Sequence, residues 1–140
     1  MKTILSSTAL VLLTGCAIFS KTSTVDQKAN EIRNLSYAAA SIGTSVALKE
    51  NPNWKLQFDL AYTTLDSLVN QKTVTGESLR NIISKLPVKE LKSDNAKIAI
   101  EEATVLFDMT VGNKINIEND PYILAAAIGI RDGLKIALGK

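Results

Sequence analysis

The fold expected for this chain is decided by residues 25–49, VDQKANEIRNLSYAAASIGTSVALK. Thr24 or Ser23 can cap a helix that starts here, and Asn51-Pro52 ends it because the residue before a proline disfavours the helical conformation. We therefore predict a long amphipathic helix over residues 24–49. Its apolar face repeats at steps of three and four residues, through Val25, Ala29, Ile32, Leu35, Ala39, Ile42 and Val46.

Four more helices are predicted downstream from the same spacing and from capping residues. The fourth helix of the chain has the widest apolar surface, because Ile98, Val105 and Met109 extend its apolar face, and we expect it to be the most buried helix. The predicted bounds are Pro52 to Asn70, Thr75 to Pro87, Ser93 to a C-cap at Gly112-Asn113, and Asp120-Pro121 onward.

These patterns predict an all-α fold, a small bundle of about five helices. The connectors are short, and Ile115-Asn116-Ile117 alternates like a strand but is too short to form a sheet, so we expect an extended connector there. The chain has 140 residues, which suits one domain. We assign residues 25–140 to a single helical domain.

Composition excludes several chemistries. The chain has 16 Lys and Arg residues and 14 Asp and Glu residues, which gives a net charge of +2. The basic residues are scattered along the sequence, so we expect no nucleic-acid partner. The sequence has no histidine and one cysteine. These counts exclude the usual zinc sites, Ser–His or Cys–His nucleophile pairs and an internal disulfide, and we expect neither a metal nor a cofactor.

The amino terminus has the order of a secretory signal. Lys2 follows Met1, and residues 3–13 are mostly apolar. This stretch is shorter than the roughly 20 apolar residues that a transmembrane helix needs. It ends in Leu13-Thr14-Gly15-Cys16, where the only cysteine of the chain stands directly after two small residues.

This ending resembles the lipobox of bacterial or phage-encoded lipoprotein precursors, which signal peptidase II cleaves. The resemblance covers the first sixteen residues and implies that the Cys16 thiol receives a diacylglyceryl group, with fatty acids such as palmitate, and that the chain is cut between Gly15 and Cys16. Residues 1–15 are then the signal peptide, and residues 16–24 the lipidated cysteine and its tether. The alternatives are a plain secretory signal with an incidental cysteine, or a buried amino-terminal helix.

The resemblance also implies a location. The mature protein is expected on a bacterial membrane, attached through lipid on Cys16, because two or more acyl chains anchor a protein stably. Ala17, not aspartate, follows the cysteine. In a Gram-negative host this favours the outer membrane, facing the periplasm.

Small residues form strips on two predicted helices. A Gly-x-x-x-Gly motif at Gly129 and Gly133 can form a dimer seam between membrane helices, but Arg131, Asp132 and Lys135 argue against a spanning helix. We therefore predict close packing of the first helix on the last within one chain. The residues assigned to this packing are Ala39, Gly43 and Ala47 in the first helix and Ala125, Gly129, Gly133 and Ala137 in the last.

Acidic side chains are the remaining candidates for catalysis, and we expect no enzymatic activity and no catalytic residue. The adjacent Glu101 and Glu102 point about 100° apart on a helix, and charges of this kind are usually solvated. Capping or ion pairing is the expected role of Asp108. A carboxylate-dependent envelope hydrolase stays open only if Asp59, Asp66 and Asp108 meet in a cleft.

An aromatic ladder runs through Trp54, Phe58 and Tyr62 at four-residue spacing. Such a ladder can form a surface for sugars or peptidoglycan, but it more often belongs to a core.

Together these observations predict a membrane-anchored lipoprotein whose helical domain binds a partner or assists assembly in the cell envelope. The expected partner is an envelope protein or a second copy of the chain. A phage- or prophage-encoded lipoprotein that excludes superinfection is the alternative.

Overall fold

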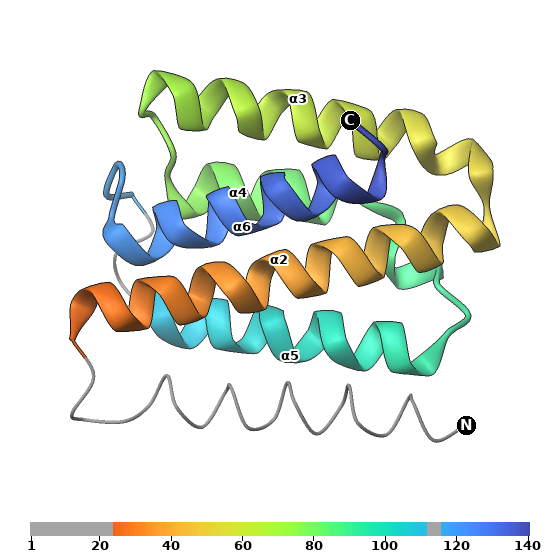
Figure 1. Ribbon diagram of the computed structural model, residues 1–140, viewed down its shortest axis with the longest axis horizontal. Coiled ribbons are helices and arrows are strands. Elements are labelled where there is room, and N and C mark those ends of the chain that lie inside the picture. The colour runs from red at the N-terminus through yellow and green to blue at the C-terminus, as the bar shows by residue number, and fades with distance from the viewer. Residues whose placement is uncertain (1–23, 112–115) are drawn as a thin grey trace.

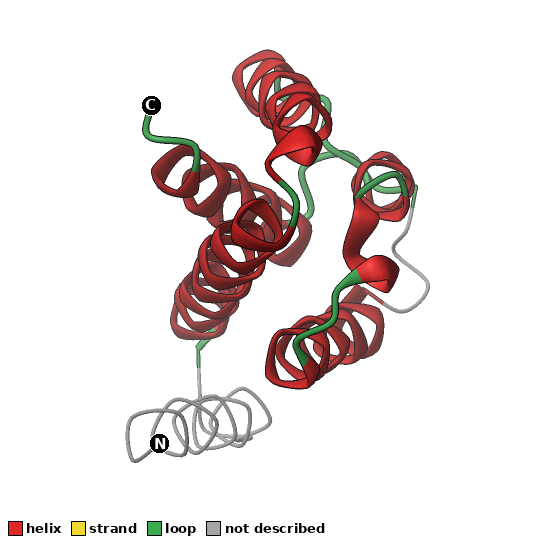
Figure 2. Ribbon diagram, turned by 90° about the vertical axis from the view of Figure 1, so that its right-hand side faces the viewer, coloured by secondary structure: helices red, strands yellow, loops and turns green. Residues whose placement is uncertain are grey.

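The computed structural model of the chain describes residues 24–111 and 116–140 (Figure 1). Within these ranges the elements are helices and turns, with no strand, which confirms the all-α prediction and the small bundle of about five helices (Figure 2). The elements are α2 (Val25–Glu50), η1 (Pro52–Trp54), α3 (Lys55–Gln71), α4 (Gly76–Ser84), η2 (Pro87–Glu90), α5 (Asp94–Val111) and α6 (Pro121–Ala137), where η1 and η2 are 3-10 turns.

The predicted amino-terminal caps are present. Thr24 and Thr75 each form a capping box with the third residue of the following helix. The carboxylate of Asp120 accepts hydrogen bonds from the backbone N–H groups of Tyr122 and Ile123, ahead of Pro121 in the first turn of α6. The Ser93 hydroxyl likewise accepts from the Ala96 N–H at 3.4 Å. These side chains satisfy N–H groups that a helix start leaves without a partner.

Two boundaries differ from the prediction. The second helix divides into η1 and α3, because the Asn51 side chain accepts from the Asn53 N–H at 3.1 Å and tightens the first turn. The third helix ends at Ser84 and Pro87 begins η2, so this proline starts a new turn.

The connector before α6 is also different. Of the predicted extended segment, Asn116 and Ile117 are described. Asn116, Glu118 and Asn119 lie in turns. Asn119 has φ 52°, a left-handed conformation that asparagine tolerates, and its N–H donates to the Val74 carbonyl at 2.8 Å. The connector is therefore tied to the segment between α3 and α4. The proposed cap at Gly112-Asn113, the signal peptide and the lipobox lie outside the described residues.

Helix α6 lies alongside α2 and α3, and α5 packs on α2 at another side (Figure 1). The core therefore forms around α6, where small side chains let the neighbouring helices approach closely. The largest fully buried side chains come from α3, α4, α6 and the connectors: Phe58, Leu65, Val74, Leu79, Leu91, Ile123 and Leu134.

Whether the fourth helix, now α5, is the most buried stays a prediction, because much of its predicted apolar face lies outside the described side chains: Ala99, Ala103, Leu106, Phe107 and Met109. Ala96 is the one buried residue among the described side chains of α5, whereas Ile98 and Val105 are 43% and 55% exposed. In α6, which is described throughout, seven residues are buried. The small residues of α6 let α2 approach it closely.

No helix in the described part of the chain has both the length and the hydropathy needed to cross a bilayer.

Candidate functional site

The contact between α2 and α6 is made through glycine. A Cβ atom placed on Gly129 would overlap the carbonyl oxygen of Arg33, and one on Gly133 would lie 2.5 Å from the carbonyl oxygen of Tyr37. Backbone therefore meets backbone at both positions, as expected for close packing of the first helix on the last. Ala125 is buried and Ala137 half-buried on the same helix.

The small residues assigned to α2 do not all face α6. A Cβ atom on Gly43 would meet the Cδ1 atom of Ile100 in α5, at 2.9 Å. The face of α2 opposite the α6 glycines carries Ser36, Tyr37 and Ala40 instead. The pairing of Gly43 with the last helix is therefore wrong, because α2 packs on two helices and Gly43 lies on the side that faces α5.

An apolar cleft of about 850 Å³ opens where α2, α4, η2 and α5 meet. Ala39, Ala40 and Gly43 hollow its α2 wall, since they carry little or no side chain. Phe58 of α3 and Leu134 of α6, both buried in the core, also line it. Its remaining apolar lining consists of Ile83, Leu86, Val88, Leu91, Ile100, Val105 and Ile130.

Charged side chains border this cleft. Arg80 of α4 and Asp108 of α5 form an ion pair with an N–O distance of 2.6 Å, and their side chains are 44% and 51% exposed. Both residues line the cleft, so the pair ties α4 to α5 at its mouth. The other charged residues of the rim are Lys89, Lys97 and Glu101.

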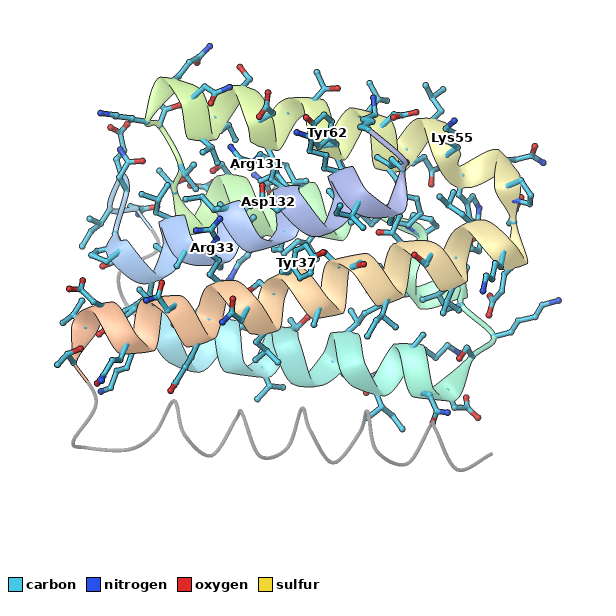
Figure 3. The ribbon with its side chains drawn as sticks, in the orientation of Figure 1. Arg33, Tyr37, Lys55, Tyr62, Arg131 and Asp132 are labelled. Carbon is cyan, nitrogen blue, oxygen red and sulfur yellow. The ribbon has the colours of Figure 1, made fainter. Side chains whose placement is uncertain are left out.

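A polar network joins the helices on another face of the bundle. The two carboxylate oxygens of Asp132 are shared between Arg131, at 2.9 Å, and Arg33, at 3.1 Å. Arg131 also lies 3.6 Å from Asp66 of α3. Figure 3 shows Arg33 of α2 near Arg131 and Asp132 of α6. Each of these charges faces an opposite charge. We therefore interpret the network as a structural connection between α2, α6 and α3.

The three aspartates considered for hydrolysis do not meet in a cleft. Asp59 pairs with Lys140 at 3.0 Å, and Asp66 pairs with Arg131. Asp108 lines the cleft and is bound by Arg80, whereas Asp59 and Asp66 do not line it. Glu101 is also at the cleft, and the side chain of Glu102 lies outside the described part. In that part no three or more His, Cys, Asp or Glu side chains gather as metal ligands would.

The aromatic ladder belongs to the core face of α3 and η1. Phe58 is 2% exposed, and Trp54 and Tyr62 are partly buried against the core. The Lys140 ammonium lies over the Tyr62 ring, 5.2 Å from the ring centre. This arrangement supports the core interpretation over an exposed sugar-binding surface.

The cleft was not identified from the sequence, which assigned its small residues to helix packing. Two signals for it were present. Ala39, Ala40 and Gly43 leave a hollow on α2, and the apolar face of α5 is wider than packing on α2 requires. Neither signal says which helix stands opposite, so the tertiary arrangement was needed.

Comparison of the chain with models of protein families, with curated proteins and with solved structures finds no match. The candidate site therefore stands on its own geometry.

Proposed function

We propose that this protein is a lipoprotein of the bacterial envelope, anchored through Cys16, and that its helical domain acts by binding and has no catalytic role. The anchor is proposed from Leu13-Thr14-Gly15-Cys16 and the signal-like segment before it. The binding role is proposed from the apolar cleft between α2, α4 and α5.

The anchor and the domain are close in sequence. Eight residues, 17–24, separate the proposed lipid site from Val25, where α2 begins. At about 3.3 Å per residue such a tether reaches at most roughly 26 Å, so the domain would work beside the lipid headgroups. Ala17 after the cysteine favours an outer membrane, facing the periplasm, in a Gram-negative host.

The cleft is the observation that carries the binding role. Sites for small molecules are concave, mostly apolar and bordered by a few polar groups, with volumes of roughly 300–1,000 Å³. The cleft has about 850 Å³, an aliphatic interior and a charged rim. The aspartates considered for catalysis are all neutralised by a lysine or an arginine, which supports binding over hydrolysis.

Attachment is tested by growing cells with labelled palmitate and following the product by electrophoresis and membrane fractionation. The wild-type chain should be labelled, shortened and membrane-bound. Cys16→Ser should give a full-length, unlabelled species.

The matched control is the double variant Cys16→Ser, Ser20→Cys, which keeps one cysteine but moves it out of the lipobox. It should also remain unlabelled and uncut. Labelling of either variant, or an unlabelled wild-type product, would overturn the proposed anchor.

A further inference from the structure

We infer that the cleft between α2, α4 and α5 binds a long-chain fatty acid, with the acyl chain inside and the carboxylate at the lysines of the rim. This ligand site depends on the proposed function in one respect, because the membrane is where the protein would meet the fatty acid. Three observations support this ligand: the lining of the cleft, the charges at its rim, and the ion pair between Arg80 and Asp108 at its opening.

The lining fits a flexible aliphatic chain. Among the described side chains that line the cleft, Phe58 is the one aromatic residue, and it is 2% exposed, so it offers a flat ring little surface for stacking. The uncharged walls are otherwise mostly alanine, leucine, isoleucine and valine, on which methylene groups pack without unmet hydrogen bonds, with the hydroxyls of Ser36, Thr44, Ser84 and Thr104 between them. Each buried methylene contributes about 0.8 kcal/mol to transfer from water.

The rim fits an anionic headgroup. Arg80 and Asp108 neutralise each other, which leaves Lys89 and Lys97 against Glu101. The described residues of the rim therefore carry a positive excess next to an apolar interior. Lysine suits this place because its stem lies along apolar surface while its ammonium stays in water, where it can meet a carboxylate.

The ion pair between Arg80 and Asp108 at the opening of the cleft disfavours a protein helix as the occupant. A helix with its side chains is about 10–12 Å wide and would have to enter from the side. The pair of Arg80 and Asp108 joins α4 to α5 at the opening. An extended acyl chain is much narrower than a helix, so it requires less separation of α4 and α5 to enter.

The experiment uses the anchored protein in phosphatidylcholine vesicles that contain a photoreactive analogue of palmitate. After illumination, the attachment sites are mapped by mass spectrometry. Label is expected on cleft residues such as Ala39, Ile83 and Ile100, and it should fall with excess palmitate but much less with uncharged methyl palmitate.

Two pairs of variants make the assignment specific. Thr104→Trp should obstruct the cleft and lower its labelling by about tenfold, while Thr64→Trp should not. Both threonines are exposed, and both donate their hydroxyl to the carbonyl four residues earlier at 2.8 Å, but only Thr104 lines the cleft.

The second pair tests the headgroup. Reversing the rim charges with Lys89→Glu and Lys97→Glu should lower labelling about three- to tenfold, because each exposed charge contributes modestly. The control reverses Lys55 and Lys135, which are exposed and lie outside the cleft. Circular dichroism checks that each variant is folded.

The outcomes separate the inference from the proposed function. Repeating the measurement with the full-length Cys16→Ser chain in the same vesicles reports on the cleft without the anchor. Cleft labelling in that chain supports the inference even if lipidation of Cys16 fails. Label confined to other surfaces, equal competition by methyl palmitate, or photocrosslinks from the cleft to a protein and not to the lipid would overturn it.

Discussion

Gly133 of α6 lies so close to Tyr37 of α2 that a Cβ atom at position 133 would come within 2.5 Å of the Tyr37 carbonyl oxygen. The obstacle is backbone, which cannot rotate away as a side chain can. Any larger residue at this position must therefore separate the two helices that pack most extensively in the bundle.

Replacing Gly133 by leucine is expected to destabilise the domain. Overpacking of this kind costs about 1–3 kcal/mol, which for a domain of this size lowers the melting temperature by about 5 °C or more. Thermal unfolding followed by circular dichroism measures the shift. Lys135→Ala, at an exposed position of the same helix, is the control. An unchanged melting temperature for Gly133→Leu would contradict the observed packing.

Alanine at Gly43 and at Gly129 should have opposite effects. A Cβ atom on Gly43 meets the far end of the flexible Ile100 side chain, whereas one on Gly129 meets the Arg33 backbone. Within a helix, alanine is favoured over glycine by about 1 kcal/mol. Gly43→Ala is therefore expected to be neutral or stabilising and Gly129→Ala destabilising in urea unfolding. Equal losses at both positions would contradict the two different surroundings.

Removing the carboxylate of Asp132 should cost more than removing that of Asp108. Asp132 is 28% exposed and serves two arginines, whereas Asp108 and its partner are about half-exposed. Exposed pairs contribute about 0–1 kcal/mol, so Asp108→Asn should lie near the bottom of that range and Asp132→Asn at about 1 kcal/mol or above. Urea unfolding at low and high salt provides the comparison, and both losses should shrink with salt. The reverse order would contradict the shared role of Asp132.

Asp120 should be the most sensitive helix cap. It is 6% exposed and accepts from two backbone N–H groups at the start of α6, whereas Thr24, at the start of α2, is exposed. Replacing a capping residue by alanine costs about 0.5–2 kcal/mol. Asp120→Ala is expected near the top of that range, with partial recovery in Asp120→Ser, and Thr24→Ala near the bottom. Equal losses would argue against this difference in burial.

Local signals in the sequence predicted most of the helices, since a cap and a periodic face act within a few residues. Thr24, Thr75 and Asp120 all cap the helices expected of them. The same signals do not predict which helix lies at the centre, because that depends on how the helices pack on one another. That place went to α6 through Gly129 and Gly133, which reduce the distance between helices and bury no large side chain of their own.

The candidate site was harder to predict than the fold. Gly43 was recognised as a packing residue, but its partner is Ile100 of α5 and not the last helix. The sequence period gives the face of α2 on which Gly43 lies, not the neighbour that face will meet. The cleft depends on that neighbour, so its lining could be identified only once the helices were assembled. Cys16 was found by a local motif, and its lipidation stays a prediction.

The glycine contacts between α2 and α6 also divide the bundle mechanically. Two backbones in direct contact can neither slide nor turn past each other without collision. Helices α2 and α6 therefore form the rigid part of the bundle. Any widening of the cleft is then expected from α4, η2 and α5; among the described residues, the solvent-exposed ion pair between Arg80 and Asp108 joins α4 to α5. Amide hydrogen exchange should accordingly be slowest in α2 and α6 and fastest in α4, η2 and α5.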